Sequence, residues 1–162
     1  MTAKEYLNQA RLLDQRINAK LDRVTRLRAL TQRVTAAMDG EVVSHTRNVT
    51  SLQDQIARLI DEEESLNAAI DRLVDLKAEV SEVLTLINDP DCQLLLELRY
   101  LCFRSWEEIA DVMHFHIRTV YKLHGRALQK LTEVLDSAEY RAIHEKWAVE
   151  GTKGQLRAVN QV

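Results

Sequence analysis

The chain has 162 residues, of which 46% are hydrophobic and 29% charged, and its formal net charge is −3. This length fits one globular domain, or one domain plus an extended element. The negative charge argues against a non-specific DNA coat, which is usually strongly basic. Four glycines and one proline leave few helix breaks, and strand patterns are nearly absent, so we expect an all-α fold.

The first long helix is expected over residues 3–38, and its apolar residues recur at heptad spacing, interrupted by Lys20 and Thr31. The heptad positions are Ala3, Tyr6, Ala10, Leu13, Ile17, Val24, Leu27, Val34 and Met38. Additional leucines widen this stripe and suggest a further surface, such as one for a second chain; they are Leu7, Leu12, Leu21 and Leu30. The helix is net basic. Asp39-Gly40 is expected to end it, with a loop through about Thr50.

The second long helix is expected over residues 51–88, with Thr50 or Ser51 as its cap. Apolar residues follow spacings of four and three throughout, interrupted only by Glu63 and Lys77. These positions are Leu52, Ile56, Leu59, Leu66, Ile70, Leu73, Val80, Leu84 and Ile87. The helix is net acidic, so its charge is opposite to that of the first helix.

Residues 1–88 are therefore expected to form a long antiparallel, coiled-coil-like helical hairpin closed at Gly40. Burial of the two apolar stripes stabilises the pair, while unlike charges select the partner. Pairing within one chain and pairing between chains both fit the pattern. The expected role of the hairpin is oligomerisation, as a homodimer or a higher homo-oligomer, or docking onto a partner.

Residues 89–136 are expected to form a trihelical domain. Pro90 fits the first turn of a helix over 91–102. Ser105 and Glu108 form the pattern of a capping box that begins a short helix. After the turn at residues 114–116, a second helix starts near Ile117 and buries five apolar residues: Val120, Leu123, Ala127, Leu128 and Leu131. A short helix, a tight turn and a longer helix predict a helix-turn-helix.

The outer face of this last helix carries four cations, each four residues after the previous one, with no acid between them. We call Arg118, Lys122, Arg126 and Lys130 the cationic ridge. On an ideal helix the ridge is about 18 Å long. A basic second helix of this kind fits a DNA major groove. The alternative is a trihelical core without a DNA role, because the same geometry also serves as plain packing.

Several segments resemble known proteins. Residues 107–110 (EEIA), Val120, Arg126-Ala127-Leu128 and Lys130-Leu131 resemble the helix-turn-helix of region four of bacterial sigma factors. Most of residues 1–136 resembles a phage-encoded family in which such a motif follows a long helical segment. The matching stretches are MTAKEYLNQARLLDQRINAKLDRV, IDRLVDLKAEV, LLLELRYLCF-x-x-WEEIA and VYKLHGRAL. The nearest functional analogues of that family are the ArpU/RinA-type late-gene regulators of phages. The resemblance implies DNA binding and transcriptional control.

The turn departs from this resemblance at two positions. Related turns place Gly where His114 stands and Ser or Thr where His116 stands. His tolerates a left-handed conformation better than most residues but less well than Gly, and it is a poorer N-cap than Ser. We therefore expect the motif to form with a less stable turn.

The remaining segment and the rest of the chemistry are less informative. Within residues 137–162 we expect a short helix that docks through Tyr140, Ile143 and Trp147, and a frayed tail from Val149. No catalytic motif, membrane span or secretory signal is visible, so the expectation is a non-enzyme without cofactors in the cytoplasm of a bacterial host, associated with the nucleoid. A zinc site is not expected, because the spacings match no usual module. The residues considered for it were His114, His116, Cys92 and Cys102.

The leading hypothesis is a sequence-specific transcriptional regulator of phage or prophage type that binds double-stranded DNA. Its hairpin is expected to dimerise the protein or to dock onto host RNA polymerase. Its recognition helix covers about 117–130. The expected DNA-binding residues are His116, Arg118, Thr119, Tyr121, Lys122, Arg126 and Lys130. Protonated His116 and His124 are expected to flank the ridge and strengthen phosphate contacts. The alternatives are a phage assembly or DNA-packaging oligomer, such as a small terminase-like ring, and a protein-only adaptor.

Overall fold

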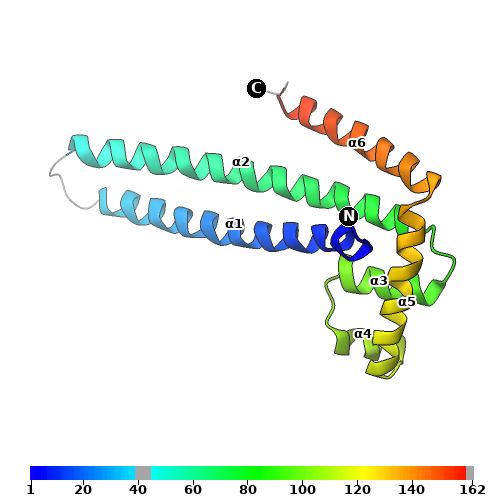
Figure 1. The fold of residues 1–162 in the computed structure, drawn as a ribbon. Helices are drawn as coiled ribbons and strands as arrows, with labels where there is room; N and C mark the ends of the chain where they lie inside the picture. The colour runs from blue at the N-terminus through cyan, green and yellow to red at the C-terminus, as the bar shows by residue number, and fades with distance from the viewer. Residues whose placement is uncertain (39–44, 160–162) are drawn as a thin grey trace. The chain divides into compact units, whose positions relative to one another are not determined.

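The computed structural model describes the backbone of residues 1–38 and 45–159, with side chains over 1–36 and 51–149. All regular secondary structure in these ranges is helical, which confirms the predicted all-α class. The elements, in chain order (Figure 1), are α1 (Ala3–Met38), α2 (His45–Leu84), α3 (Pro90–Leu96), the π-helix η1 (Glu97–Leu101), α4 (Trp106–Met113), α5 (Ile117–Leu135) and α6 (Ala138–Val159).

The chain divides into two compact units. The first, which we call the terminal unit, contains residues 1–12 and 72–162. The second, the paired-helix unit, contains residues 13–71. Helices α1 and α2 contribute to both. The predicted trihelical segment, 89–136, therefore lies wholly within the terminal unit, together with the start of α1 and the end of α2.

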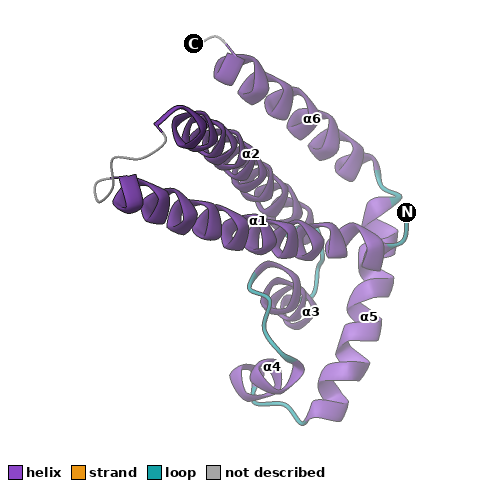
Figure 2. Cartoon of the chain, turned by 90° about the vertical axis from the view of Figure 1, so that its left-hand side faces the viewer, coloured by secondary structure: helices purple, strands orange, loops and turns teal. Residues whose placement is uncertain are grey.

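In the paired-helix unit, α1 and α2 lie side by side and run antiparallel (Figures 1 and 2). Basic residues of α1 meet polar and acidic residues of α2, as the opposite charges of the two helices predict. The contacts are Lys20 Nζ–Ser65 Oγ at 2.6 Å, Arg23–Glu62 at 3.2 Å and Arg28–Glu63 at 2.6 Å. Arg23 and Arg28 remain 62% and 60% exposed, so each pair adds little stability.

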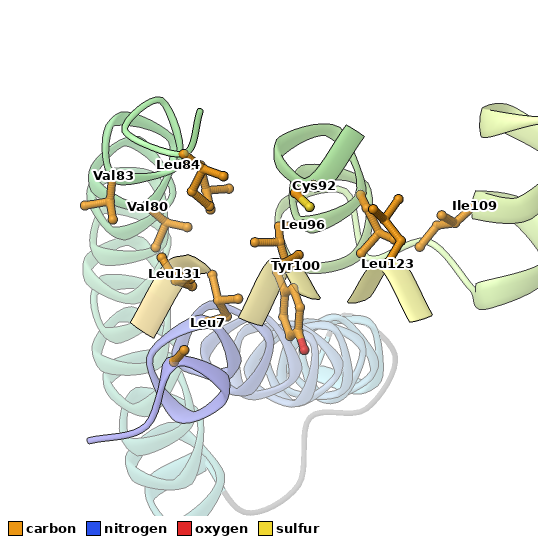
Figure 3. Packing of buried hydrophobic residues seen from close by; sticks show 14 of the residues in the cluster. Leu7, Val80, Val83, Leu84, Cys92, Leu96, Tyr100, Ile109, Leu123 and Leu131 are labelled. Carbon is orange, nitrogen blue, oxygen red and sulfur yellow. The ribbon is translucent and has the colours of Figure 1, made fainter. Parts of the chain in front are cut away.

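The core of the terminal unit brings together residues that are distant in the sequence. Side chains from the start of α1 and the end of α2 gather with those of α3, α4 and α5 (Figure 3). Fully buried members include Leu7, Leu84, Leu96, Ile109 and Leu131. The buried face of α5 is the predicted one, because Val120, Leu123, Ala127 and Leu131 are buried and Leu128 is half-buried. The core thus fixes which face of α5 is left to solvent.

The last helix docks through the aromatic residues that the sequence singled out. The ring of Tyr140 stands edge-on to that of Tyr6, with 5.8 Å between the centroids. The indole Nε1 of Trp147 donates to Glu82 at 2.9 Å, and Ile143 packs against the core. The prediction of a docked helix is confirmed. The predicted tail is wrong over residues 149–159, because α6 continues to Val159 despite two glycines, each costing only about 1 kcal/mol in a helix.

Helix α2 differs from its prediction at both ends. It begins at His45, so residues 45–50 are helical rather than part of a loop, and neither Thr50 nor Ser51 is its cap. β-branched residues lower helix propensity by only tenths of a kcal/mol each, which extension of an existing helix readily offsets. Gly40, the predicted closing point, lies outside the described residues. At the other end α2 stops at Leu84 instead of residue 88.

The helix predicted over 91–102 is instead two elements. Helix α3 ends at Leu96, and η1 follows with a hydrogen bond from the Cys102 N–H to the Glu97 carbonyl at 3.0 Å. This bond spans five residues, which is a π-type arrangement. Phe103 then takes a positive φ of 57°, and Lys77 lies 4.5 Å from its ring centroid. Apolar spacing of three and four does not signal a π-bulge, so the sequence could not predict this break.

Candidate nucleic-acid interface

A capping box fixes the residue at which α4 begins. Ser105 Oγ accepts from the Glu108 N–H at 3.2 Å, and Glu108 Oε2 accepts from the Ser105 N–H at 2.7 Å. This is the predicted capping box, and it satisfies two backbone donors that would otherwise lack helical partners. The hydrogen bonds to the Ser105 N–H and from Arg104 also hold the pKa of the Glu108 carboxyl below its ordinary value.

The turn between α4 and α5 is short (Figure 2), and it consists of His114, Phe115 and His116. His114 adopts the left-handed conformation, with φ 54° and ψ 38°, as the comparison with glycine-containing turns predicts. His116 is extended and caps α5, because its Nδ1 accepts from the Arg118 N–H at 3.2 Å. The cap thus occupies Nδ1 of the His116 ring.

The exposed face of the first turns of α5 is polar and cationic. Arg118, Thr119 and Lys122 are exposed, and neither cation forms an ion pair with any carboxylate in the described part of the chain. Thr119 and Lys122 also line a shallow cavity of about 170 Å³, with Asp91, Phe115, Leu123 and Arg126 as its other lining residues. This half of the cationic ridge remains available to a polyanion.

The second half of the ridge turns toward a carboxylate. A step of four residues overshoots one helical turn by about 40°, so Lys130 lies about 120° around the axis from Arg118. The Lys130 Nζ reaches Asp89 Oδ2 at 2.8 Å, and the Arg126 Nε lies 3.8 Å from the same oxygen. Arg126 remains 57% exposed and Lys130 36% exposed. The predicted absence of a counter-charge along the ridge is therefore wrong for these two residues.

Asp89 can pair with the ridge because it starts α3. Its side chain accepts from the Cys92 N–H at 3.2 Å, so the carboxylate is fixed at the helix start, and Pro90 follows in the first turn. The hydrogen bond from Lys130, followed by those from Cys92, holds the pKa of Asp89 well below its ordinary value. An Asp before a Pro is a recognisable signal for a helix start, but the contact between Asp89 and α5 depends on tertiary packing.

An aromatic cluster borders the other side of α5. The Trp106 ring lies 5.3 Å from that of Tyr121 and 4.8 Å from that of His124, and the Arg99 guanidinium stacks on it at 4.4 Å. Tyr121 stays 48% exposed beside Lys122. The sequence indicated Tyr121 but not Arg99 or Trp106, whose approach to α5 results from the packing of η1 and α4.

His124 does not flank the ridge as predicted. Its Nε2 lies 3.0 Å from the Tyr100 hydroxyl, and the ring is half-buried between Tyr100 and Trp106. Burial, assisted by the positive charges of Lys4 and Arg99, lowers the pKa of His124. The His124 ring therefore packs at the edge of the core, and its protonation is disfavoured.

Comparisons with known proteins add no relative. No protein-family model, curated protein or solved structure matches the chain. Among the described residues, none of the helices has the length and apolar character required to cross a lipid bilayer.

Proposed function

We propose that this protein is a sequence-specific, DNA-binding transcriptional regulator of phage or prophage type, with α5 as its recognition helix in the major groove. The observation that carries the proposal is the exposed pair Arg118 and Lys122, with Thr119 between them. These residues occupy the first turns of a helix whose entry is set by a capped α4 and a three-residue turn. Recognition helices present their N-terminal residues to base edges in the same way.

The residues have different expected roles. Arg118 is suited to the two acceptors of guanine, and Lys122 to a phosphate or a base edge. Thr119 offers a hydroxyl and a methyl group between them. Arg126 keeps most of its guanidinium accessible for a phosphate, because its contact with Asp89 at 3.8 Å is loose. Lys130 makes the close contact at 2.8 Å and is expected to contribute least.

The residues at the edges of this surface are suited to contacts with the phosphate backbone of DNA. Tyr121 is held edge-on to Trp106 and exposes half of its side chain next to Lys122. His116 lies at the start of the helix, where phosphates flank the groove. Phosphate contacts orient such a helix, and base-edge contacts specify the sequence. In this proposal the protein acts in the host cytoplasm at the nucleoid, and its long helices join two copies or bind RNA polymerase.

Selective retention of DNA tests the proposal. Genomic fragments surrounding the gene of this protein are incubated with the full chain, and bound fragments are sequenced after washing at several salt concentrations. We expect one or a few fragments to be retained well above the remainder, because specific sites typically bind at least about a thousandfold tighter than other DNA. Uniform retention of all fragments, or retention of none, would contradict sequence-specific regulation.

A further inference from the structure

The paired-helix unit buries very little of its apolar surface. Among its described residues only Val24, Leu66 and Ala69 are buried. The terminal unit, by contrast, has a core to which both long helices and four shorter elements, α3, η1, α4 and α5, contribute buried residues. Two helices alone bury one narrow strip between them, which is too little to hold long helices together. Further packing is therefore expected on this unit.

Helix α2 carries an exposed apolar stripe beside the contact with α1, and it includes Ile56 and Ile70, which the sequence pattern placed between the two helices. Ile56, Ile60 and Ile70 remain 40%, 50% and 39% exposed. Glu63 occupies a position between them, so the stripe follows the alternating spacing of four and three that marks one face of a helix. Val74, 60% exposed, continues the same spacing farther along α2. A regular stripe of this kind is typical of a helix–helix contact.

The ion pairs show which side of the unit the stripe occupies. Glu63 accepts from Arg28, so the stripe lies on the Arg28 side of the pair. Leu21, seven residues before Arg28, lies on the same side of α1 and is 50% exposed. We call Leu21, Ile56, Ile60 and Ile70 the isoleucine face. Leu30 is nine residues from Leu21, about two and a half turns, and therefore lies on the opposite side of α1.

The charges of the unit fit a second copy of itself better than any partner of one sign. On the side of the isoleucine face, α1 carries Arg28, seven residues after Leu21. On the same side, α2 carries two exposed acids, Glu64, four residues after Ile60, and Asp71. A wholly acidic or wholly basic partner would be repelled by one of the two helices. A second copy that places its α1 against α2, and its α2 against α1, meets opposite charge on both.

We propose that the isoleucine face binds a second copy of this chain, forming a four-helix interface in which α1 of each copy packs on α2 of the other. A contact that runs along about 20 residues of each helix covers roughly 30 Å by 20 Å. The buried area is then about 600 Å² per copy and about 1,200 Å² in total, which reaches the range of stable protein interfaces. This inference does not depend on DNA binding.

Sedimentation velocity of the full chain from about 1 to about 100 µM tests the interface, because the fraction of dimer rises with protein concentration. We expect the native chain to sediment as a dimer. Leu21→Glu and Ile60→Glu should each give a monomer with unchanged helical circular dichroism, because both place a charge within the isoleucine face. Leu30→Glu is the matched control, since the same residue type with 48% exposure lies on the other side of α1. It should remain dimeric.

Three results would overturn the proposal. One is a native chain that is monomeric at all concentrations tested. Another is a dimer that Leu30→Glu dissociates while Leu21→Glu and Ile60→Glu do not. The third is a ring of eight or more copies, which would fit packaging instead. DNA retention by a monomeric Ile60→Glu variant is a separate measurement, so the two proposals can fail independently.

Discussion

Asp89 contributes to the fold and limits the candidate interface. Its carboxylate begins α3 by accepting from the Cys92 N–H, and it holds Lys130 and Arg126 on its other side. The lowered pKa of Asp89 keeps it ionised throughout the neutral range. The cationic ridge is therefore divided by a single acid into an available half and an occupied half.

Replacing this acid should extend the cationic surface. Asp89→Asn retains a good helix cap, since Asn and Asp are about equally favoured, but releases Arg126 and Lys130. We expect tighter binding to arbitrary duplex DNA and a steeper dependence on salt, by up to about two phosphate equivalents. Fluorescence anisotropy over a salt series measures both. Asp54→Asn is the control, because it removes the same charge from an exposed position on α2 that forms no ion pair with the ridge; equal effects of the two variants would contradict this role of Asp89.

His124 makes stability depend on pH in a defined direction. Burial lowers the pKa of His124 below its ordinary value of 6.5, so the unfolded chain binds a proton that the folded chain resists. The contribution is complete above pH 6.5 and is lost as the pH falls through the lowered pKa. Chemical denaturation at several pH values should show a shallower loss of unfolding free energy in His124→Gln than in the native chain. If the unfolding free energy of both proteins depends on pH with the same slope, this role of His124 is contradicted.

At the scale of elements, α4 and the turn that follows it combine residues that favour and residues that disfavour the local backbone conformation. The capping box of Ser105 and Glu108 is favourable, whereas His114 pays for a left-handed backbone with a φ of 54°. Gly adopts this conformation without the clash of a Cβ atom.

His114→Gly should therefore raise the free energy of unfolding by about 0.5–1 kcal/mol, after the greater entropy of Gly in the unfolded chain is included. Thermal denaturation followed by circular dichroism measures the change. His114→Ala keeps the Cβ atom and serves as control; it should give no stabilisation. A stabilised Ala variant would show that the imidazole, rather than the backbone strain, is unfavourable at this position.

Features encoded by neighbouring residues were predictable, and those that depend on distant ones were not. Ser105–Glu108 capping and the buried face of α5 follow from local spacing, and the left-handed His114 follows from the resemblance to turns with Gly at this position. The structure confirms each of them. The π-turn at η1 and the early start of α2 have no periodic signal. The pairing of Lys130 with Asp89 joins residues 41 apart in the sequence. It required the packing of α3 on α5, which no local pattern contains.

For the whole molecule, the distribution of charge matters more than its sum. The net charge of −3 conceals a basic α1, an acidic α2 and a cationic start of α5. The acidic excess lies largely on α2, whereas Arg118 and Lys122 form a small exposed surface on the terminal unit. Such a molecule is expected to bind DNA through a limited, specific contact instead of general attraction.

The claim that α5 recognises DNA is tested most directly by the affinity of the double variant Arg118→Ala, Lys122→Ala for the retained fragment. We expect binding at least about tenfold weaker than that of the native chain, because one base contact alone is worth about 1–3 kcal/mol. The control variant Arg58→Ala, Arg72→Ala removes two exposed cations from α2 and should bind as the native chain does. Equal affinity of both variants and the native chain would contradict a recognition role for α5.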